Sequence, residues 1–111
     1  KYLDGKTLTV IPADLPKPLA EKIRRLAART FIALDAAGMA RVDFFVDRET
    51  NQAYVNEINT IPGFTSISMY PKLWEASGLP YSEMLDAVIS LAAGRAKEKR
   101  ALRRSYSPMK V

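Results

Sequence analysis

The sequence contains no cysteine and no histidine. The absence of cysteine excludes disulfides, thiolate nucleophiles and zinc–thiolate sites in this chain. The absence of histidine excludes a Ser-His-Asp triad and histidine metal ligands. No apolar run reaches the roughly 18 residues that a membrane span needs, and no secretory signal is visible. Any chemistry must therefore come from carboxylates, arginine, lysine, tyrosine, hydroxyl groups and backbone amides.

The chain has 111 residues, of which 48% are hydrophobic and 26% charged, as in an ordinary globular domain. Its net charge of +5 is concentrated at one end, because residues 95–111 hold seven basic residues and one acidic residue. The preceding residues are close to neutral. A basic segment can bind a phosphate polymer, and it can equally be a solvated helix end that frays. Because the chain starts at Lys1 and not at Met, we expect it to be the C-terminal piece of a longer polypeptide.

Hydrophobic spacing predicts a mixed set of elements. We expect a short strand over residues 8–11, and then a helix that is entered at Asp14-Leu15-Pro16 and ends at Gly38. We expect strands over residues 39–47 and 53–59, joined by a hairpin loop, and a short helix over residues 70–77 with Gly78 just past its end. A last helix should begin near Ser82 or Glu83. The first helix is the most regular element, with an apolar stripe of Leu19, Ile23, Leu26, Ala27, Phe31 and Leu34.

The two predicted hairpin strands carry polar side chains on one face. Side chains alternate along a strand, so Arg41 and Asp43 share a face of the first strand. Val55, Glu57 and Asn59 should share a face of the second strand. A hairpin that turns near Thr50 places Asp43 opposite Glu57 and Arg41 opposite Asn59.

Two facing carboxylates repel each other, and something must offset that repulsion. Arg41 could do so, and so could a divalent cation held by Asp43, Glu57 and Asn59, because hard cations take oxygen ligands. Mg²⁺ typically completes its shell with phosphate oxygens and water, which would make this a nucleotide-associated metal site. The alternative is an exposed polar face of an antiparallel sheet.

The segment after the second strand, residues 60–68, is irregular and contains Gly63. Glycine permits a close approach of a ligand to the backbone, and the segment leads into a helix N-terminus, where free amides favour an anion. Three hydroxyl groups lie here, from Thr65, Ser66 and Ser68. Capping of the helix by Ser66 or Ser68 is the alternative reading.

Three blocks of sequence stand out: Arg41-Val42-Asp43-Phe44-Phe45, Asn56-Glu57-Ile58-Asn59-Thr60-Ile61-Pro62-Gly63-Phe64-Thr65 and Ser68-Met69-Tyr70-Pro71. They resemble the C-terminal part of D-alanine–D-alanine ligases of the ATP-grasp superfamily, and the resemblance extends from Lys1 to about Ala93. The resemblance implies an α+β fold, in which residues 1–94 form the C-terminal part of an ATP-grasp domain, with an antiparallel sheet packed against helices. Residues 95–111 would be a basic C-terminal tail. The implied activity is the ATP-dependent joining of two D-alanines through an acyl phosphate, for peptidoglycan precursor synthesis.

The resemblance also implies roles for individual residues. Asp43, Glu57 and Asn59 match ligands of two Mg²⁺ ions that hold the ATP phosphates, and Mn²⁺ can take their place. Arg41 and the Gly63 amide match the groups that stabilise the oxyanion of the tetrahedral intermediate. Ser68 and Met69 match the pocket for the carboxylate of the second D-alanine. Lys1 resembles a lysine near the phosphates, and Tyr2 resembles a tyrosine of the mobile loop that closes the site.

The family needs further subdomains that do not fit in this length, so we expect the fragment to be inactive without the preceding residues of the same protein. We also expect a homodimer in the cytoplasm with ATP and D-alanine as partners, and no membrane or nucleic acid. Two alternatives stay open: D-lactate or D-serine as the second substrate, and a non-catalytic module that binds nucleic acid through the basic tail.

Overall fold

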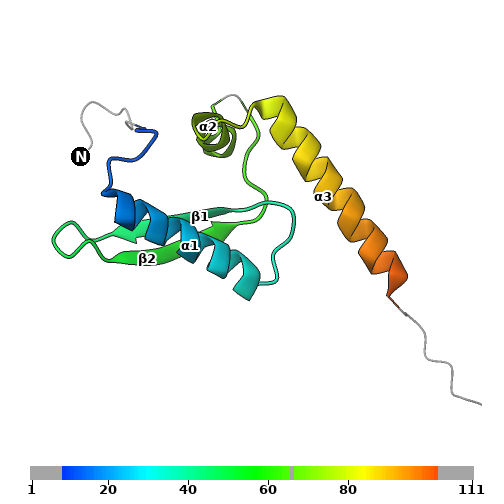
Figure 1. Cartoon of the computed structure of the whole chain (residues 1–111), viewed down its shortest axis with the longest axis horizontal. Helices are drawn as coiled ribbons and strands as arrows, with labels where there is room; N and C mark the ends of the chain where they lie inside the picture. Colours follow the sequence, from blue (N-terminus) through cyan, green and yellow to red (C-terminus); the bar gives the residue numbers. More distant parts are fainter. Residues whose placement is uncertain (1–8, 66, 103–111) are drawn as a thin grey trace, which may run out of the picture.

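A computed structural model describes residues 9–65 and 67–102. The elements follow the order α1 (Lys17–Ala33), β1 (Arg41–Val46), β2 (Ala53–Asn59), α2 (Met69–Ala76) and α3 (Tyr81–Ala101). β1 and β2 form an antiparallel two-stranded sheet. Helix α1 packs along this sheet, and α3 packs against α2 (Figure 1). The predicted α+β class, with an antiparallel sheet packed against helices, is confirmed.

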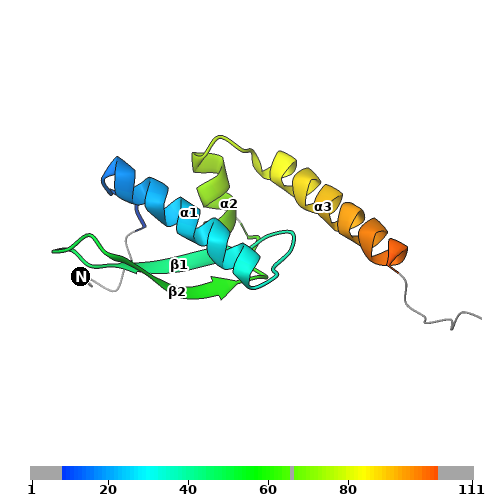
Figure 2. The ribbon, with the colours of Figure 1, turned by 60° about the horizontal axis from the view of Figure 1, so that its bottom comes forward.

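The apolar stripe of α1 is turned towards the sheet. Leu19 is buried, and Ile23, Leu26 and Phe31 are half-buried. Leu34 was predicted to belong to the stripe but is 60% exposed, because the helix has already ended at Ala33. Figure 2 shows α1 lying along one face of the two strands.

Helix α1 ends earlier than predicted, and Gly38 is not the residue that ends it. Asp35 takes the left-handed conformation after the helix, with a φ of 49°. The Asp35 amide donates to the Ile32 carbonyl (3.0 Å) and the Ala36 amide donates to the Phe31 carbonyl (3.1 Å), which is the Schellman pattern. An aspartate tolerates this conformation better than most residues, so no glycine is needed there. At the end of α2 the prediction is confirmed, because Gly78 has a φ of 90° in the equivalent position.

The predicted strand over residues 8–11 is wrong for the part that the structure describes. Thr9, Val10 and Ile11 form no strand, and Val10 is 56% exposed. A strand needs a hydrogen-bonded neighbour, and within the described residues β1 and β2 pair with each other alone. Residues 9–11 therefore have no neighbouring strand to pair with, in spite of their β propensity. Leu8 lies outside the described residues.

The hairpin contains a β-bulge. Asp43 pairs with Glu57 and Phe44 pairs with Val55, so Asn56 is the additional residue on β2. Val55 consequently shares the face of its partner Phe44, and the prediction that it shares a face with Glu57 is wrong. At the far end the Asp47 carboxylate holds the loop, since it accepts hydrogen bonds from the amides of Glu49 (2.9 Å) and Thr50 (2.7 Å). The hydrogen bond from the Thr50 amide is the largest of the causes that lower the pKa of Asp47.

Helix α3 extends further than its packing against α2 requires. It begins at Tyr81, close to the predicted start, and it continues past Arg95 to Ala101. Met84 is 2% exposed against the rest of the fold, whereas Ile89 and Leu91 are more than half exposed. The described part of the basic segment is therefore a solvent-exposed helix end. Among all the residues that the structure describes, no helix is both long and apolar enough to cross a membrane.

Little apolar surface is buried in the described residues. The core consists of one buried hydrophobic side chain from each helix: Leu19, Tyr70 and Met84. Large hydrophobic side chains remain exposed on every element, including Phe45, Val55 and Trp74. The radius of gyration is 19.0 Å, against about 13 Å for a compact domain of this length.

Candidate functional site

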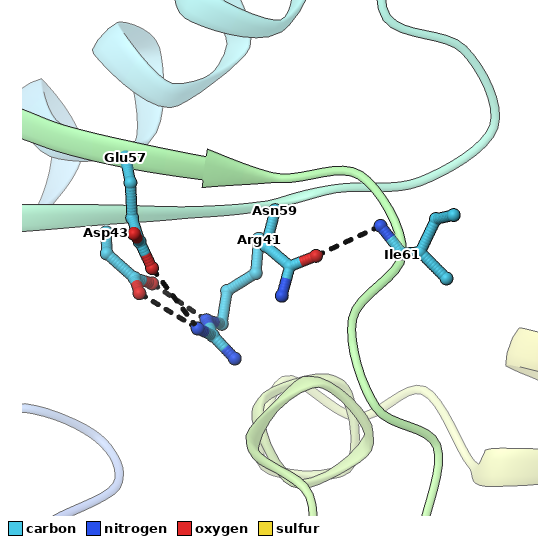
Figure 3. Close-up of polar contacts among 5 residues, drawn as sticks. All are labelled: Arg41, Asp43, Glu57, Asn59 and Ile61. Carbon is cyan, nitrogen blue, oxygen red and sulfur yellow. Dashed lines mark hydrogen bonds and ion pairs between the residues drawn. The ribbon is translucent and has the colours of Figure 1, made fainter.

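Four polar side chains leave the hairpin on the face away from α1 (Figure 3). They belong to Arg41 and Asp43 of β1 and to Glu57 and Asn59 of β2. Arg41 pairs with Asn59 and Asp43 pairs with Glu57 across the ladder. The predicted register is therefore confirmed at the end of the hairpin where these residues lie, and the two carboxylates point to the same side of the sheet.

Arg41 holds the two carboxylates together. Its Nε donates to Asp43 Oδ1 at 2.8 Å and its Nη2 donates to Asp43 Oδ2 at 2.9 Å, which is a bidentate pair. The same Nη2 lies 4.0 Å from Glu57 Oε1. The hydrogen bond to Asp43 raises the pKa of Arg41 above its ordinary value, and the charges of Asp43 and Glu57 add to this against partial desolvation. Arg41 therefore offsets part of the repulsion between the two carboxylates.

Asn59 is oriented by the backbone that follows it. Its Oδ1 accepts a hydrogen bond from the Ile61 amide at 3.1 Å, so the side chain bends over the start of the irregular segment (Figure 3). A carbonyl oxygen has two lone pairs, and one stays available when the other accepts this bond. Asn59 therefore couples the end of β2 to the backbone that leads to Gly63.

The donor set suits a hard divalent cation. Within the described residues, no group of three or more carboxylate, histidine or cysteine side chains could hold a metal by itself. Two carboxylates and one amide oxygen do share one face, and Mg²⁺ commonly binds through one or two carboxylates while phosphates and water complete its shell. The oxygens of Asp43 are engaged by a cationic group, so a positive charge is already accommodated at this position. The residues fit an Mg²⁺ site that is completed by a phosphorylated ligand.

The segment after β2 is closed by hydroxyl groups. The Thr65 amide donates to Ser68 Oγ at 3.0 Å, and the two hydroxyl oxygens lie 2.7 Å apart. The Ser68 amide donates back to the Thr65 carbonyl at 2.9 Å. Ser68 stands at the N-cap position of α2 but makes no side-chain capping bond, so that alternative reading is wrong for Ser68. Its hydroxyl shapes the segment instead, while Ser66 lies outside the described residues.

Gly63 is required by this closure. A Cβ at position 63 would lie 2.8 Å from Ser68 Oγ, which is closer than real Cβ contacts allow. The side chain of Ser68 is short, and its Oγ is held by Thr65, so it cannot move aside without losing its hydrogen bonds. The glycine thus allows the loop to fold back on itself.

Gly63→Ala is expected to destabilise the full-length protein by about 1–3 kcal/mol, the usual cost of an added methyl group that does not fit. Ser68→Ala removes the clashing oxygen, so the double variant should lose less than the sum of the two single changes. Urea denaturation of the wild type, both single variants and the double variant measures this coupling. Strict additivity would contradict the assigned contact.

The remaining predicted residues divide into two groups. Met69 is the first residue of α2 and is half-buried beside Ser68. Lys1 and Tyr2 lie outside the described residues.

Sequence reasoning did not single out Tyr81, whose hydroxyl donates to the Phe64 carbonyl at 3.2 Å across 17 residues. No local pattern indicates such a contact, because it depends on how α3 packs against α2.

Comparison with known proteins defines the class and then the family. The fold of this chain matches the C-terminal part of an ATP-grasp fold. The chain superposes on a D-alanine–D-alanine ligase from Coxiella burnetii with a TM-score of 0.77 and 52% identity, over 79% of this chain and 25% of that one. A D-alanine–D-alanine ligase from Bacillus anthracis in complex with ATP gives 0.70 and 36%, over 78% of this chain and 30% of that one.

The family model for the D-ala D-ala ligase C-terminus matches residues 1–90, and the chain belongs to this family. Curated relatives named D-alanine–D-alanine ligase include one from Caldicellulosiruptor bescii, 54% identical over 95% of this chain. Another, from Ruminiclostridium cellulolyticum, is 60% identical over 90% of this chain. The chain spans 29% and 27% of the lengths of these two proteins.

Proposed function

We propose that the protein to which this chain belongs joins two D-alanines into D-alanyl-D-alanine with ATP, for peptidoglycan precursor synthesis. Membership of the ligase family supports this reaction. The observation that carries the proposal is the polar face of the hairpin, where two carboxylates, an amide and an arginine point to one side. Phosphoryl and acyl transfer rely on positioning and charge neutralisation, which these groups can supply.

The reaction has two steps. A carboxylate oxygen of the first D-alanine attacks the γ-phosphorus of ATP, and ADP leaves, so that an acyl phosphate forms. The amine of the second D-alanine then attacks the acyl carbon, inorganic phosphate leaves, and the nitrogen loses a proton. Neither step needs a covalent bond to the protein, so the residues act by positioning the substrates and neutralising charge.

Asp43, Glu57 and Asn59 would hold two Mg²⁺ ions, or Mn²⁺ in their place. These ions supply charge neutralisation to the transferred phosphoryl group. The Glu57 side chain is 61% exposed and is open to a ligand from solution. Both Asp43 oxygens accept hydrogen bonds from Arg41, so Asp43 would bind an ion by exchanging at least one of these bonds for it. We assign Glu57 and Lys1 to the nucleotide side of the site.

Arg41 and the Gly63 amide would stabilise the oxyanion of the tetrahedral intermediate. Figure 3 shows one terminal amino group of Arg41 turned away from both carboxylates, so the side chain can bind them and still present a donor. Ser68 and Met69 would receive the carboxylate of the second D-alanine. Tyr2 would belong to the loop that closes over the site.

Further features of the whole protein are part of the proposal. The large hydrophobic side chains left exposed on every element would be covered by the preceding residues of the same protein. We propose that residues 1–94 are the catalytic part and that residues 95–111 are a tail, in a cytoplasmic homodimer. D-lactate or D-serine as the second substrate is the alternative that the same site would also serve.

The isolated 111-residue chain is expected to release no phosphate from ATP when D-alanine and Mg²⁺ are added, whereas the full-length protein does. The reason is that the hairpin supplies only one side of a nucleotide site and the described core is small. A phosphate-release assay on both proteins, with D-lactate and D-serine as competing second substrates, measures activity and specificity together. A full-length protein without D-alanine-dependent phosphate release would refute the proposed function.

A further inference from the structure

A contact between two distant parts of the chain holds the loop that contains Gly63. Tyr81 is the first residue of α3, and its hydroxyl donates to the Phe64 carbonyl at 3.2 Å. The Phe64 ring lies between two other rings, with its centroid 6.3 Å from that of Tyr81 and 5.5 Å from that of the buried Tyr70. Figure 1 and Figure 2 both show α2 and the start of α3 side by side, and the loop contacts both helices through Phe64.

The peptide group that joins Phe64 to Thr65 is fixed at both of its polar ends. Its carbonyl oxygen accepts from the Tyr81 hydroxyl, and its N–H donates to Ser68 Oγ at 3.0 Å. A rotation of this peptide plane would break both bonds at once. One bond comes from within the loop and the other comes from α3, so the hydroxyl of Tyr81 is the loop's external anchor.

Gly63 makes such an anchor necessary. A glycine has no Cβ to restrict its backbone, so its own amide could take many directions. Pro62 before the glycine is buried, and Phe64 after it is held by its ring contacts and by the hydrogen bond from Tyr81 to its carbonyl. The flexible residue is therefore held between two immobilised ones.

We infer that Tyr81 is a positioning residue for acyl transfer. Its hydroxyl sets the peptide after Phe64, and through it the direction of the Gly63 amide and the place of the Ser68 hydroxyl. In this role Tyr81 would act through the loop and not through contact with the substrate. The inference rests on the proposed function, in which the Gly63 amide faces the oxyanion and Ser68 faces the carboxylate of the second D-alanine.

The test uses the full-length protein with Tyr81→Phe, which removes one oxygen and keeps the ring. We expect kcat to fall about three- to tenfold, the size of one hydrogen bond between neutral groups, with the KM for ATP unchanged. Tyr54→Phe is the matched control, because Tyr54 is an exposed tyrosine on β2. Hydrogen exchange at the amides of residues 63–65 should accelerate in Tyr81→Phe and not in Tyr54→Phe.

Equal kcat values for the two variants, in a protein whose wild type is an active ligase, would overturn the inference. A lower Tm with unchanged kcat per folded enzyme, or unchanged exchange at residues 63–65, would also overturn it, because the contact would then be structural only. A wild type without D-alanine-dependent turnover is a different result, since it refutes the proposed function itself.

Discussion

Asp43→Asn in the full-length protein is expected to reduce D-alanine-dependent ADP formation at least about hundredfold, since even groups that only orient metal ligands are worth ten- to hundredfold. The substitution removes one of the two negative charges from the polar face and one partner of the bidentate pair with Arg41. Glu57→Gln should have an effect of the same kind. A coupled ADP assay over a range of Mg²⁺ concentrations measures both variants.

Asp47→Asn is the matched control for this prediction. Asp47 lies at the other end of the hairpin, where its carboxylate accepts amide hydrogen bonds within the loop, and an asparagine oxygen can also accept them. Its turnover should equal that of the wild type. Thermal unfolding of Glu57→Gln should stay close to the wild type, because its 4.0 Å ion pair with Arg41 involves an exposed carboxylate. Asp43→Asn keeps one side-chain oxygen that can still accept from Arg41, so a modest loss of stability is expected there. Wild-type rates in both Asp43→Asn and Glu57→Gln would remove the metal assignment.

Arg41→Ala is expected to lower kcat about 10²- to 10³-fold, the usual loss for one oxyanion donor, with a smaller change in the KM for ATP. Because Arg41 also neutralises Asp43, its removal should free the carboxylate oxygens and lower the Mg²⁺ concentration needed for half-maximal rate. A lower kcat together with a higher apparent Mg²⁺ affinity would show that Arg41 both stabilises the oxyanion and neutralises Asp43. Initial rates at varied Mg²⁺ and ATP measure the two effects separately.

Arg41→Lys is the companion variant. Lysine keeps the positive charge but cannot form the bidentate pair, so it should restore the Mg²⁺ dependence more fully than it restores kcat. A strong loss of ATP binding with normal turnover in Arg41→Ala would contradict the oxyanion role.

The pairing at the polar face could be predicted from the sequence because it depends on short-range geometry. Alternation fixes which side chains share a face, and a hairpin centred near Thr50 fixes which ones meet, so Arg41, Asp43, Glu57 and Asn59 were placed correctly relative to one another. The roles of these residues in binding and catalysis remain predictions.

The errors arise where the outcome depends on a partner or on one extra residue. Residues 9–11 have the composition of a strand, but no described segment pairs with them. Val55 was assigned to the wrong face because no local signal marked Asn56 as a bulge. Ser68 matched a cap by its position, yet its hydroxyl bonds to Thr65, since the loop folds back on itself. In each case the hydrogen-bond partner that the structure offers, and not the propensity of the residue, decided.

At the bulge, β2 can lose its extra residue, Asn56, without a change in the pairing of the polar face. Removing residue 56 would leave a regular ladder in which Asp43 still faces Glu57 and Arg41 still faces Asn59. Removing Ile58 instead would bring Glu57 opposite Val42 and turn its carboxylate to the side of α1. Insertions and deletions in this hairpin should therefore be tolerated between the bulge and the tip, and they should be forbidden in the three ladder pairs that precede the loop with Gly63.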